Sequence, residues 1–301
     1  MEVNIFQYGF ITKGLLGALF ASITAGLTGT YIVSKRMVFL SGGITHASFG
    51  GIGIGYFAGI NPVIGAAVFS ILSALGVEYL SGRHKIREDS AIGILWAFGM
   101  AIGIIFIYLT PGYAPDLMSY LFGSILTVTD ADIIALGIIS VILIIYFGAF
   151  YRTILYISYD ESFARTYSSY VDVFKYVTTA LVALTIVLNI RMAGVILVLS
   201  LLTIPPNIAM LFTRIYSRII LWSILAGFAG TATGYVVSYF AGIPVGATVI
   251  FTLVIIWIIV KVIHQITRQI SKINPDQIVD SPKSGSSARP GSPEANLKAE
   301  A

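Results

Sequence analysis

The feature that most constrains this chain is a series of long apolar runs. Crossing the roughly 30 Å hydrocarbon core of a bilayer takes a helix of about 20 apolar residues. Only 11% of the residues are charged, whereas a soluble domain has about 25%. We therefore predict an all-α, multi-pass membrane protein of about nine transmembrane helices. The nine runs cover residues 12–34, 38–58, 62–80, 90–109, 130–150, 174–190, 193–212, 219–240 and 243–263.

The distribution of basic residues predicts the orientation of these spans. If the N-terminus lies outside, sixteen of the eighteen lysines and arginines fall in inner loops or the C-terminal tail. Only Lys13 and Arg191 then lie outside. Inner loops of membrane proteins are enriched in Lys and Arg, so this split favours an outside N-terminus and a cytoplasmic C-terminus. That arrangement needs an odd number of spans, and eight spans is the alternative if two runs are misjudged.

Two segments are not expected to cross the membrane. Residues 116–128 form a stretch too short to span, which predicts a re-entrant or interfacial helix. The chain beyond Pro282 is rich in Ser, Gly, Pro and Ala, a composition typical of disorder. We therefore expect a transmembrane domain over 1–272 and a flexible cytoplasmic tail over 273–301.

Several functional classes are disfavoured by the sequence. There are no cysteines, so disulfides, thiolate metal sites and cysteine nucleophiles are excluded. No P-loop motif is present to hold ATP, and no His-Glu-x-x-His motif is present to hold catalytic zinc. The net charge of +4 arises mainly from loop residues and does not indicate a nucleic-acid partner. These absences argue against a membrane-embedded enzyme.

Small residues and prolines mark special points within the spans. The second run carries small residues at four-residue spacing, which predicts close helix packing and is also compatible with a sliding gate. Pro205 and Pro206 lie in the seventh run and mark a helix break, either a plain kink or a broken helix lining a pathway. The small residues are Gly43, Ala47, Gly51, Gly55 and Gly59.

A few polar residues stand in or next to the apolar runs. His46 lies about 12 Å into the second span, where it is either hydrogen-bonded to a neighbouring helix or one ligand of a transient metal site. Asp116, Asp130 and Asp132 are expected near the outer mouth, as helix caps or as an acidic vestibule for cations. In the inner loop 151–173, Asp160 is a plausible start of a short amphipathic helix, either solvated or used for docking.

Six blocks of the sequence, in order along residues 12–263, resemble one known family. That family is the ABC-3 metal permeases, the membrane subunits of zinc, manganese and iron importers. The resemblance implies a homodimer in the bacterial inner membrane, two cytoplasmic ATPase subunits that hydrolyse ATP, and an extracytoplasmic metal receptor. The blocks are KRMVFLSGGITHASFGGIGIGY (35–56), EDSAIGILWAFGMAIG (88–103), DLMSYLFGSILTVTDADI (116–133), DESFA (160–164), GVILVLSLLTIPPNIA (194–209) and GYVVSYFAGIPVGATVI (234–250).

The resemblance also implies roles for individual residues. His46 and Asp116 match positions near the family's metal pathway, with His46 as the expected metal ligand. The family usually has aspartate at two positions where this chain has Gly42 and Gly242. The expected outer gate comprises Asp130, Asp132 and Pro244, and the expected contact with the ATPase comprises Asp160, Glu161 and Ala164.

The resemblance implies a transported ion and no permanently bound cofactor. An imidazole without a nearby carboxylate favours zinc, so Zn²⁺ is the first expectation and Mn²⁺ or Fe²⁺ the next. A secondary cation carrier or channel that works without an ATPase is the alternative function, and a membrane-embedded enzyme is a third class.

Overall fold

The computed structural model describes residues 9–83, 87–111 and 128–273, and the regular structure in these ranges is helical. The expected short helix over 116–128, including Asp116, lies almost wholly outside the described residues, and so does the tail beyond Ile273. The helices are α1 (Gly9–Ser34), α2 (Val38–Phe57), α3 (Pro62–Arg83), α4 (Glu88–Leu109), α6 (Asp130–Ala149), α7 (Tyr151–Tyr159), α8 (Glu161–Tyr167), α9 (Val171–Ala193), α10 (Val195–Phe212), α11 (Tyr216–Ala241) and α12 (Val245–Ile273).

Each of the nine predicted spans coincides with a long helix in the described part of the chain. Eight of those helices are long and apolar enough to cross a membrane. The remaining one, α2, has 20 residues and is rich in glycine, serine and threonine, which lowers its hydropathy. The chain is therefore a polytopic all-α membrane protein.

The chain divides into two compact units, residues 1–261 and 262–301. The first contains α1 to α11 and α12 up to Lys261. Of the second, the structure describes the last part of α12. All residues discussed below as functional belong to the first unit.

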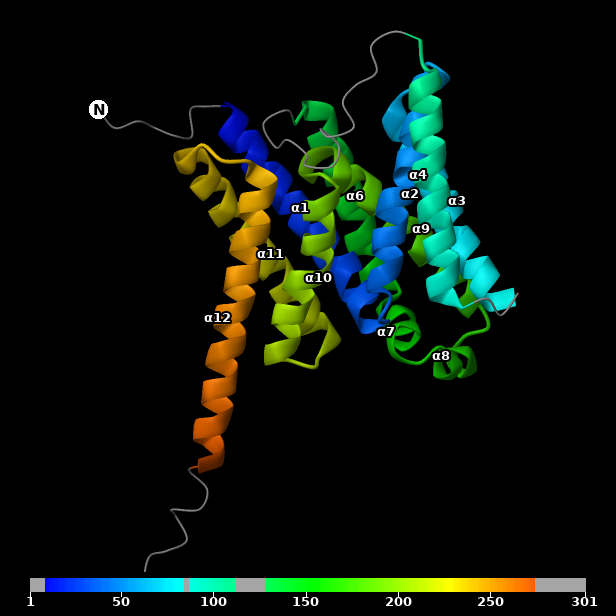
Figure 1. Cartoon of the computed structure of the whole chain (residues 1–301). Coiled ribbons are helices and arrows are strands. Elements are labelled where there is room, and N and C mark those ends of the chain that lie inside the picture. Colours follow the sequence, from blue (N-terminus) through cyan, green and yellow to red (C-terminus); the bar gives the residue numbers. More distant parts are fainter. Residues whose placement is uncertain (1–8, 84–86, 112–127, 274–301) are drawn as a thin grey trace, which may run out of the picture. The chain divides into compact units, whose positions relative to one another are not determined.

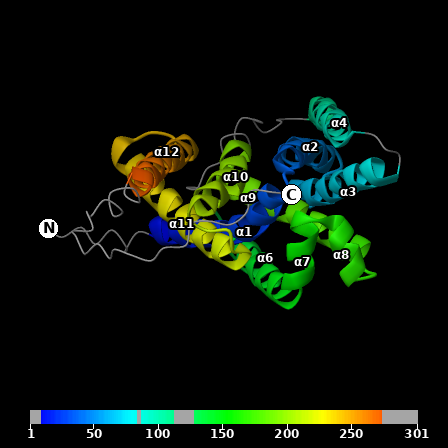
Figure 2. The same cartoon turned by 90° about the horizontal axis from the view of Figure 1, so that it is seen from below.

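Within the first unit, α1 is the central helix. Its membrane-spanning stretch is 72% buried, whereas that of α4 is 17% buried. Helix α1 packs against α6, α10 and α11, while α2 packs against α3 and α4, and α3 packs against α9. Figure 2 shows α2, α3 and α4 side by side, next to the group formed by α1, α10 and α11.

The small residues of α2 lie where other helices come closest. A Cβ atom on Gly51 would overlap the backbone of Gly65 in α3, and one on Gly53 would overlap the backbone of Gly103 in α4. Small residues allow such close approach in a membrane, where van der Waals packing replaces the hydrophobic effect. Gly59 does not share in this contact, because α2 ends at Phe57 and Gly59 adopts a φ of 67° in the following turn with nothing near its Cβ position.

Pro205 and Pro206, predicted to mark either a kink or a broken helix, lie inside a helix that is assigned without interruption. Helix α10 continues through both prolines, which are buried. Pro206 cannot donate to the carbonyl of Leu202, and Gly29 of α1 packs against that carbonyl. We attribute the continuity of α10 to this close packing, which covers the carbonyl that lost its backbone donor.

Candidate functional site

His46 lies on α2 against an aromatic ring of α4. Its ring is stacked on Trp96, with centroids 4.3 Å apart and planes 8° from parallel. The Nδ1 atom is buried and has no hydrogen-bond partner among the described residues. Among those residues, no group of three or more His, Cys, Asp or Glu side chains is arranged to hold a metal. His46 alone could therefore bind a metal ion only weakly, as expected of a transient ligand.

Gly42 stands one helical turn before His46, at a position where the resembling family usually has aspartate. A Cβ atom at Gly42 would meet Trp96 at 3.8 Å and Leu199 at 4.0 Å, both ordinary contact distances. The backbone therefore has room for a side chain there. Residues four apart share one helix face, so a carboxylate at position 42 would lie beside the imidazole.

The acidic residues at the start of α6 form ion pairs and a helix cap. Asp132 and Thr129 form a capping box, in which the Thr129 side chain accepts from the Asp132 backbone N–H and the Asp132 carboxylate accepts from the Thr129 backbone N–H. Asp130 pairs with Lys13 at 2.7 Å, and Asp132 pairs with Arg191 at 2.6 Å. Helix capping thus accounts for Asp132 here. The pairs also join these aspartates to the two basic residues that were predicted outside.

Pro244 lies in the exposed turn between α11 and α12. Gly242 ends α11 in the left-handed conformation, with φ of 66°, which glycine adopts without steric penalty. The Ser238 hydroxyl donates to the Ile243 carbonyl at 2.6 Å, and the Pro244 carbonyl accepts from Thr248. The turn is therefore well defined. Gly242, which stands where the family usually has aspartate, gives the turn its shape.

The expected short helix in the inner loop is present as α8, which follows α7 directly. Asp160 caps it by accepting the Phe163 N–H at 3.0 Å. Ala164 is 1% exposed and packs into the main core, whereas Phe163 is exposed. Figure 1 shows α7 and α8 at one end of the bundle, which we call the α8 end. The cap and the buried alanine hold α8 against the bundle with its other face open.

A network of ion pairs connects α8 to the bundle. Arg165 makes two hydrogen bonds to Asp172, at 2.7 and 3.1 Å, and one to Glu161 at 2.9 Å. These bonds to Asp172 and Glu161 raise the pKa of the Arg165 guanidinium. Lys175 of α9 bonds the other Glu161 oxygen at 3.1 Å and also bonds Glu78 of α3 at 2.5 Å. A single ammonium thus joins carboxylates on two different helices.

Glu78 is the innermost member of this network, with 4% of its side chain exposed. It also receives a hydrogen bond from Thr179 at 3.4 Å and has Lys35 3.9 Å away. From the sequence alone, Glu78 is an acidic residue near the end of the third apolar run, and its partners are not indicated. The available signal was an acidic residue within an otherwise apolar run, since such groups are rare and paired.

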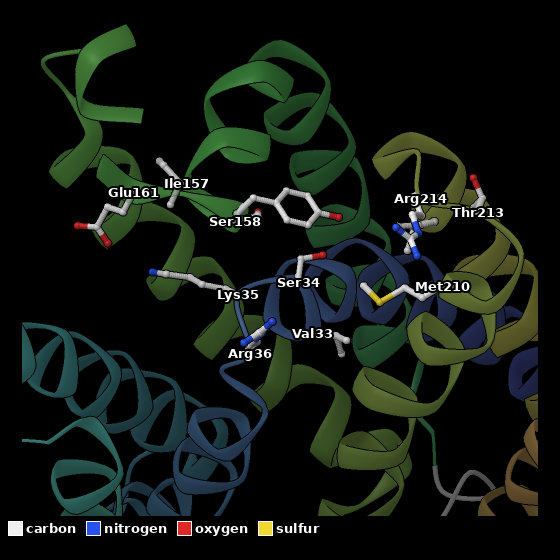
Figure 3. Close-up of a pocket in the computed structure, with 12 residues that line it drawn as sticks. Val33, Ser34, Lys35, Arg36, Ile157, Ser158, Glu161, Met210, Thr213 and Arg214 are labelled. Atoms are coloured by element: carbon white, nitrogen blue, oxygen red, sulfur yellow. The ribbon is translucent and has the colours of Figure 1, made fainter. Parts of the chain in front are cut away.

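A cavity of about 790 Å³ opens at the α8 end, between the ends of α1, α7 and α10. Lys35, Arg36 and Arg214 give its lining a basic character, and Glu161 supplies a carboxylate. Figure 3 shows Lys35 extending toward Glu161, with Arg214 on the far side. Burial lowers the pKa of the Lys35 ammonium, and the carboxylates of Glu161 and Glu88 oppose that effect.

Comparisons with known proteins agree with this architecture. The model of the ABC 3 transport family matches residues 7–264. An uncharacterized membrane protein of Synechocystis is 42% identical over 70% of this chain and 75% of its own length. The manganese transport system membrane protein MntC of Listeria innocua is 32% identical over 78% of this chain and 84% of its own length.

A solved structure shares the fold across most of the chain. PsaBC from Streptococcus pneumoniae, determined in complex with Fab, superposes with a TM-score of 0.76 at 27% identity, covering 85% of this chain and 92% of the other. The chain therefore belongs to the ABC 3 transport family and is a multi-pass metal permease subunit of the bacterial plasma membrane, not an enzyme, because ATP hydrolysis in such importers resides in a separate subunit.

Proposed function

We propose that this permease imports a divalent transition-metal ion delivered by an extracytoplasmic receptor, driven by two copies of a cytoplasmic ATPase. Family membership supports the ATP-driven class. The proposed coupling to the ATPase rests on the geometry of α8. This capped seven-residue helix presents an open face, while its buried side is anchored by Ala164. In this proposal α8 lies on the cytoplasmic side, and Asp160 and Glu161 lie in the contact with the ATPase. Ala164, predicted as part of that contact, is buried and holds α8 against the bundle instead.

Two of the three candidates for the transported ion are each favoured by a specific observation. The Listeria relative is named for manganese, which supports Mn²⁺. The lone imidazole of His46, without a carboxylate from position 42, supports Zn²⁺, because zinc accepts nitrogen ligands more readily than manganese does. Fe²⁺ is the third candidate. In each case the ion is cargo, and no cofactor is proposed to stay bound.

We place the outer part of the ion pathway at the end of the bundle opposite α8. Asp130, Asp132 and Pro244 lie in segments that would face the receptor, whereas Asp116 lies outside the described residues. The ion pairs of Asp130 and Asp132 can open and re-form, as a gate requires. We further propose that two copies of the permease enclose the pathway between them.

The deciding experiment is uptake by proteoliposomes that contain the permease with its co-purified ATPase and receptor. Mn²⁺, Zn²⁺ and Fe²⁺ are offered separately, with and without ATP. We expect ATP-dependent uptake of one ion, a lower rate for His46→Ala, and an unchanged rate for the control His264→Ala. If the permease alone passes ions down a gradient, the alternative of a carrier or channel replaces the importer.

A second variant tests the route on α2. Gly42→Asp restores a carboxylate where the backbone has room for it. We expect it to lower the Mn²⁺ concentration needed for half-maximal uptake, and to do so only when His46 is present. If the effect is the same in the His46→Ala background, the ion does not pass along this face of α2.

A further inference from the structure

The ion pairs at the α8 end form one continuous connection from α8 into the bundle. Starting at Glu161, the contacts pass through Lys175 to Glu78, which also faces Lys35. Exposure falls along this connection. The side chain of Asp172, which pairs with Arg165 of α8, is 60% exposed, whereas that of Glu78 is 4% exposed. The connection therefore runs from the surface that would meet the ATPase to a buried point between α3 and α9.

This arrangement is not what packing alone would favour. Burying charges loses their hydration, and a well-packed apolar pair of similar volume is often at least as stable as a buried ion pair. Here four charged groups, Glu78, Lys175, Glu161 and Lys35, share a site that apolar side chains would fill. Their charges balance, so the loss of any one of them alone leaves a net charge in the site. Separating Glu161 from Lys175 would upset this balance, so these groups are expected to move together when α8 is displaced.

The far end of the connection leads to the helix that carries His46. Lys35 is the first residue after α1, and α2 begins only three residues later, at Val38. The turn between them is tightly hydrogen-bonded: Met37 donates to Ile32 at 2.9 Å, and Arg36 has a φ of 60°. A short, fully bonded turn transmits a displacement instead of absorbing it. Movement at Lys35 therefore reaches α2.

We propose that Lys175 and Glu78 are positioning residues that transmit the displacement of α8 to α3 and, through Lys35, to α2. Lys175 acts as the link because its ammonium bonds carboxylates from α8 and α3 together. The inference rests on the proposed function, since it assumes that an ATPase moves α8. It assigns to two residues outside α8 the task of coupling that movement to the ion pathway.

The test is the double variant Glu78→Gln/Lys175→Met in the complex with its ATPase. Removing one positive and one negative charge together leaves the net charge of the site unchanged, so this variant is expected to assemble. We expect it to retain ATPase binding and hydrolysis while ion uptake per ATP falls at least about tenfold, a difference of about 1.4 kcal/mol in coupling. The control is Lys261→Met, which removes an exposed ammonium of α12 outside this network and is expected to leave the ions transported per ATP within about twofold of wild type.

The outcomes separate the two proposals. If wild type shows no ATP-dependent uptake, the proposed function is wrong whatever the variants do. If wild type transports and the double variant moves as many ions per ATP, the proposed link is wrong and the importer stands. A purely structural role for the pair would lower the melting temperature without changing the ratio of ions to ATP.

A distance measurement gives an independent readout that does not depend on transport. The chain has no cysteine, so Ser162→Cys and Leu72→Cys place spin labels only on exposed sites of α8 and α3. With the Glu161–Lys175–Glu78 link intact, we expect a narrow distribution of the distance between the two labels, and the same distribution with and without ATP. Glu161→Gln, which leaves the buried Glu78–Lys175 pair in place, is expected to broaden it. An unchanged narrow distribution in that variant would overturn the proposal.

Discussion

The close approach of α1 and α10 leads to a sharp prediction for Gly29→Ala. A Cβ atom at Gly29 would lie 2.5 Å from the carbonyl oxygen of Leu202 and 3.0 Å from its Cα. A carbon and a carbonyl oxygen rest at about 3.3 Å or more, so the helices must separate by about 0.8 Å. The atoms in the way are backbone atoms, which no rotamer change can move.

The size of the effect follows from two opposing contributions. Forcing an extra methyl group into a packed core costs about 1–3 kcal/mol. Alanine regains up to about 1 kcal/mol through its better helix propensity. The net expectation is a loss of about 1–2 kcal/mol, which corresponds to a fall in melting temperature of roughly 2–8 °C for a chain of this size.

The assay is thermal unfolding in detergent, followed by circular dichroism, with Gly148→Ala as the matched control. Gly148 is in α6, is exposed and has nothing within 4 Å of its Cβ position. We expect that variant to melt at or slightly above wild type, since only helix propensity changes. If Gly29→Ala melts no lower than Gly148→Ala, close backbone packing does not hold α1 against α10, and the explanation given for the unbroken α10 fails with it.

Three further predictions concern charges and caps. Thr129→Ala removes the hydroxyl of the capping box and should lower stability by about 1 kcal/mol, whereas Thr129→Ser should retain it; thermal unfolding measures both. Lys175→Met leaves the buried Glu78 carboxylate without its short ion pair and should lower stability by about 3–5 kcal/mol, with most of the loss recovered on adding Glu78→Gln; an equal loss in the double variant would contradict the pairing. The pKa of Lys35 is lowered by burial from the 10.5 of an unfolded chain, so the unfolded state binds more protons in the window below 10.5 and stability should rise with pH there. Lys35→Met should reduce that rise, which is measured as the difference in melting temperature between about pH 8 and about pH 10.

The spans and the family were predictable because they depend on local properties. A run of about 20 apolar residues forms a helix in lipid whatever its neighbours are, since the backbone must satisfy its own hydrogen bonds. The start of α8 was also predictable, because Asp160 caps the helix through a hydrogen bond to a residue only three positions further along the chain. The same holds for the capping by Asp132.

The partners of the buried charges could not be predicted in this way. Glu78 and Lys175 are 97 positions apart in the sequence, and nothing local indicates that their side chains meet. The stacking of His46 on Trp96 likewise depends on how α2 lies against α4. The close contact of Gly29 with the carbonyl of Leu202, next to Pro205 and Pro206, depends in the same way on how α1 lies against α10.

The sequence by itself thus determined the class of protein, the positions of its helices and the family to which it belongs. Only the tertiary structure decided which charges pair at the α8 end, which carbonyl Gly29 approaches and where the cavity opens. The physical reason is the separation along the chain over which each kind of interaction acts. Hydropathy, capping and turn preferences act within a few residues, whereas ion pairs and close helix contacts depend on the three-dimensional arrangement of segments far apart in the chain.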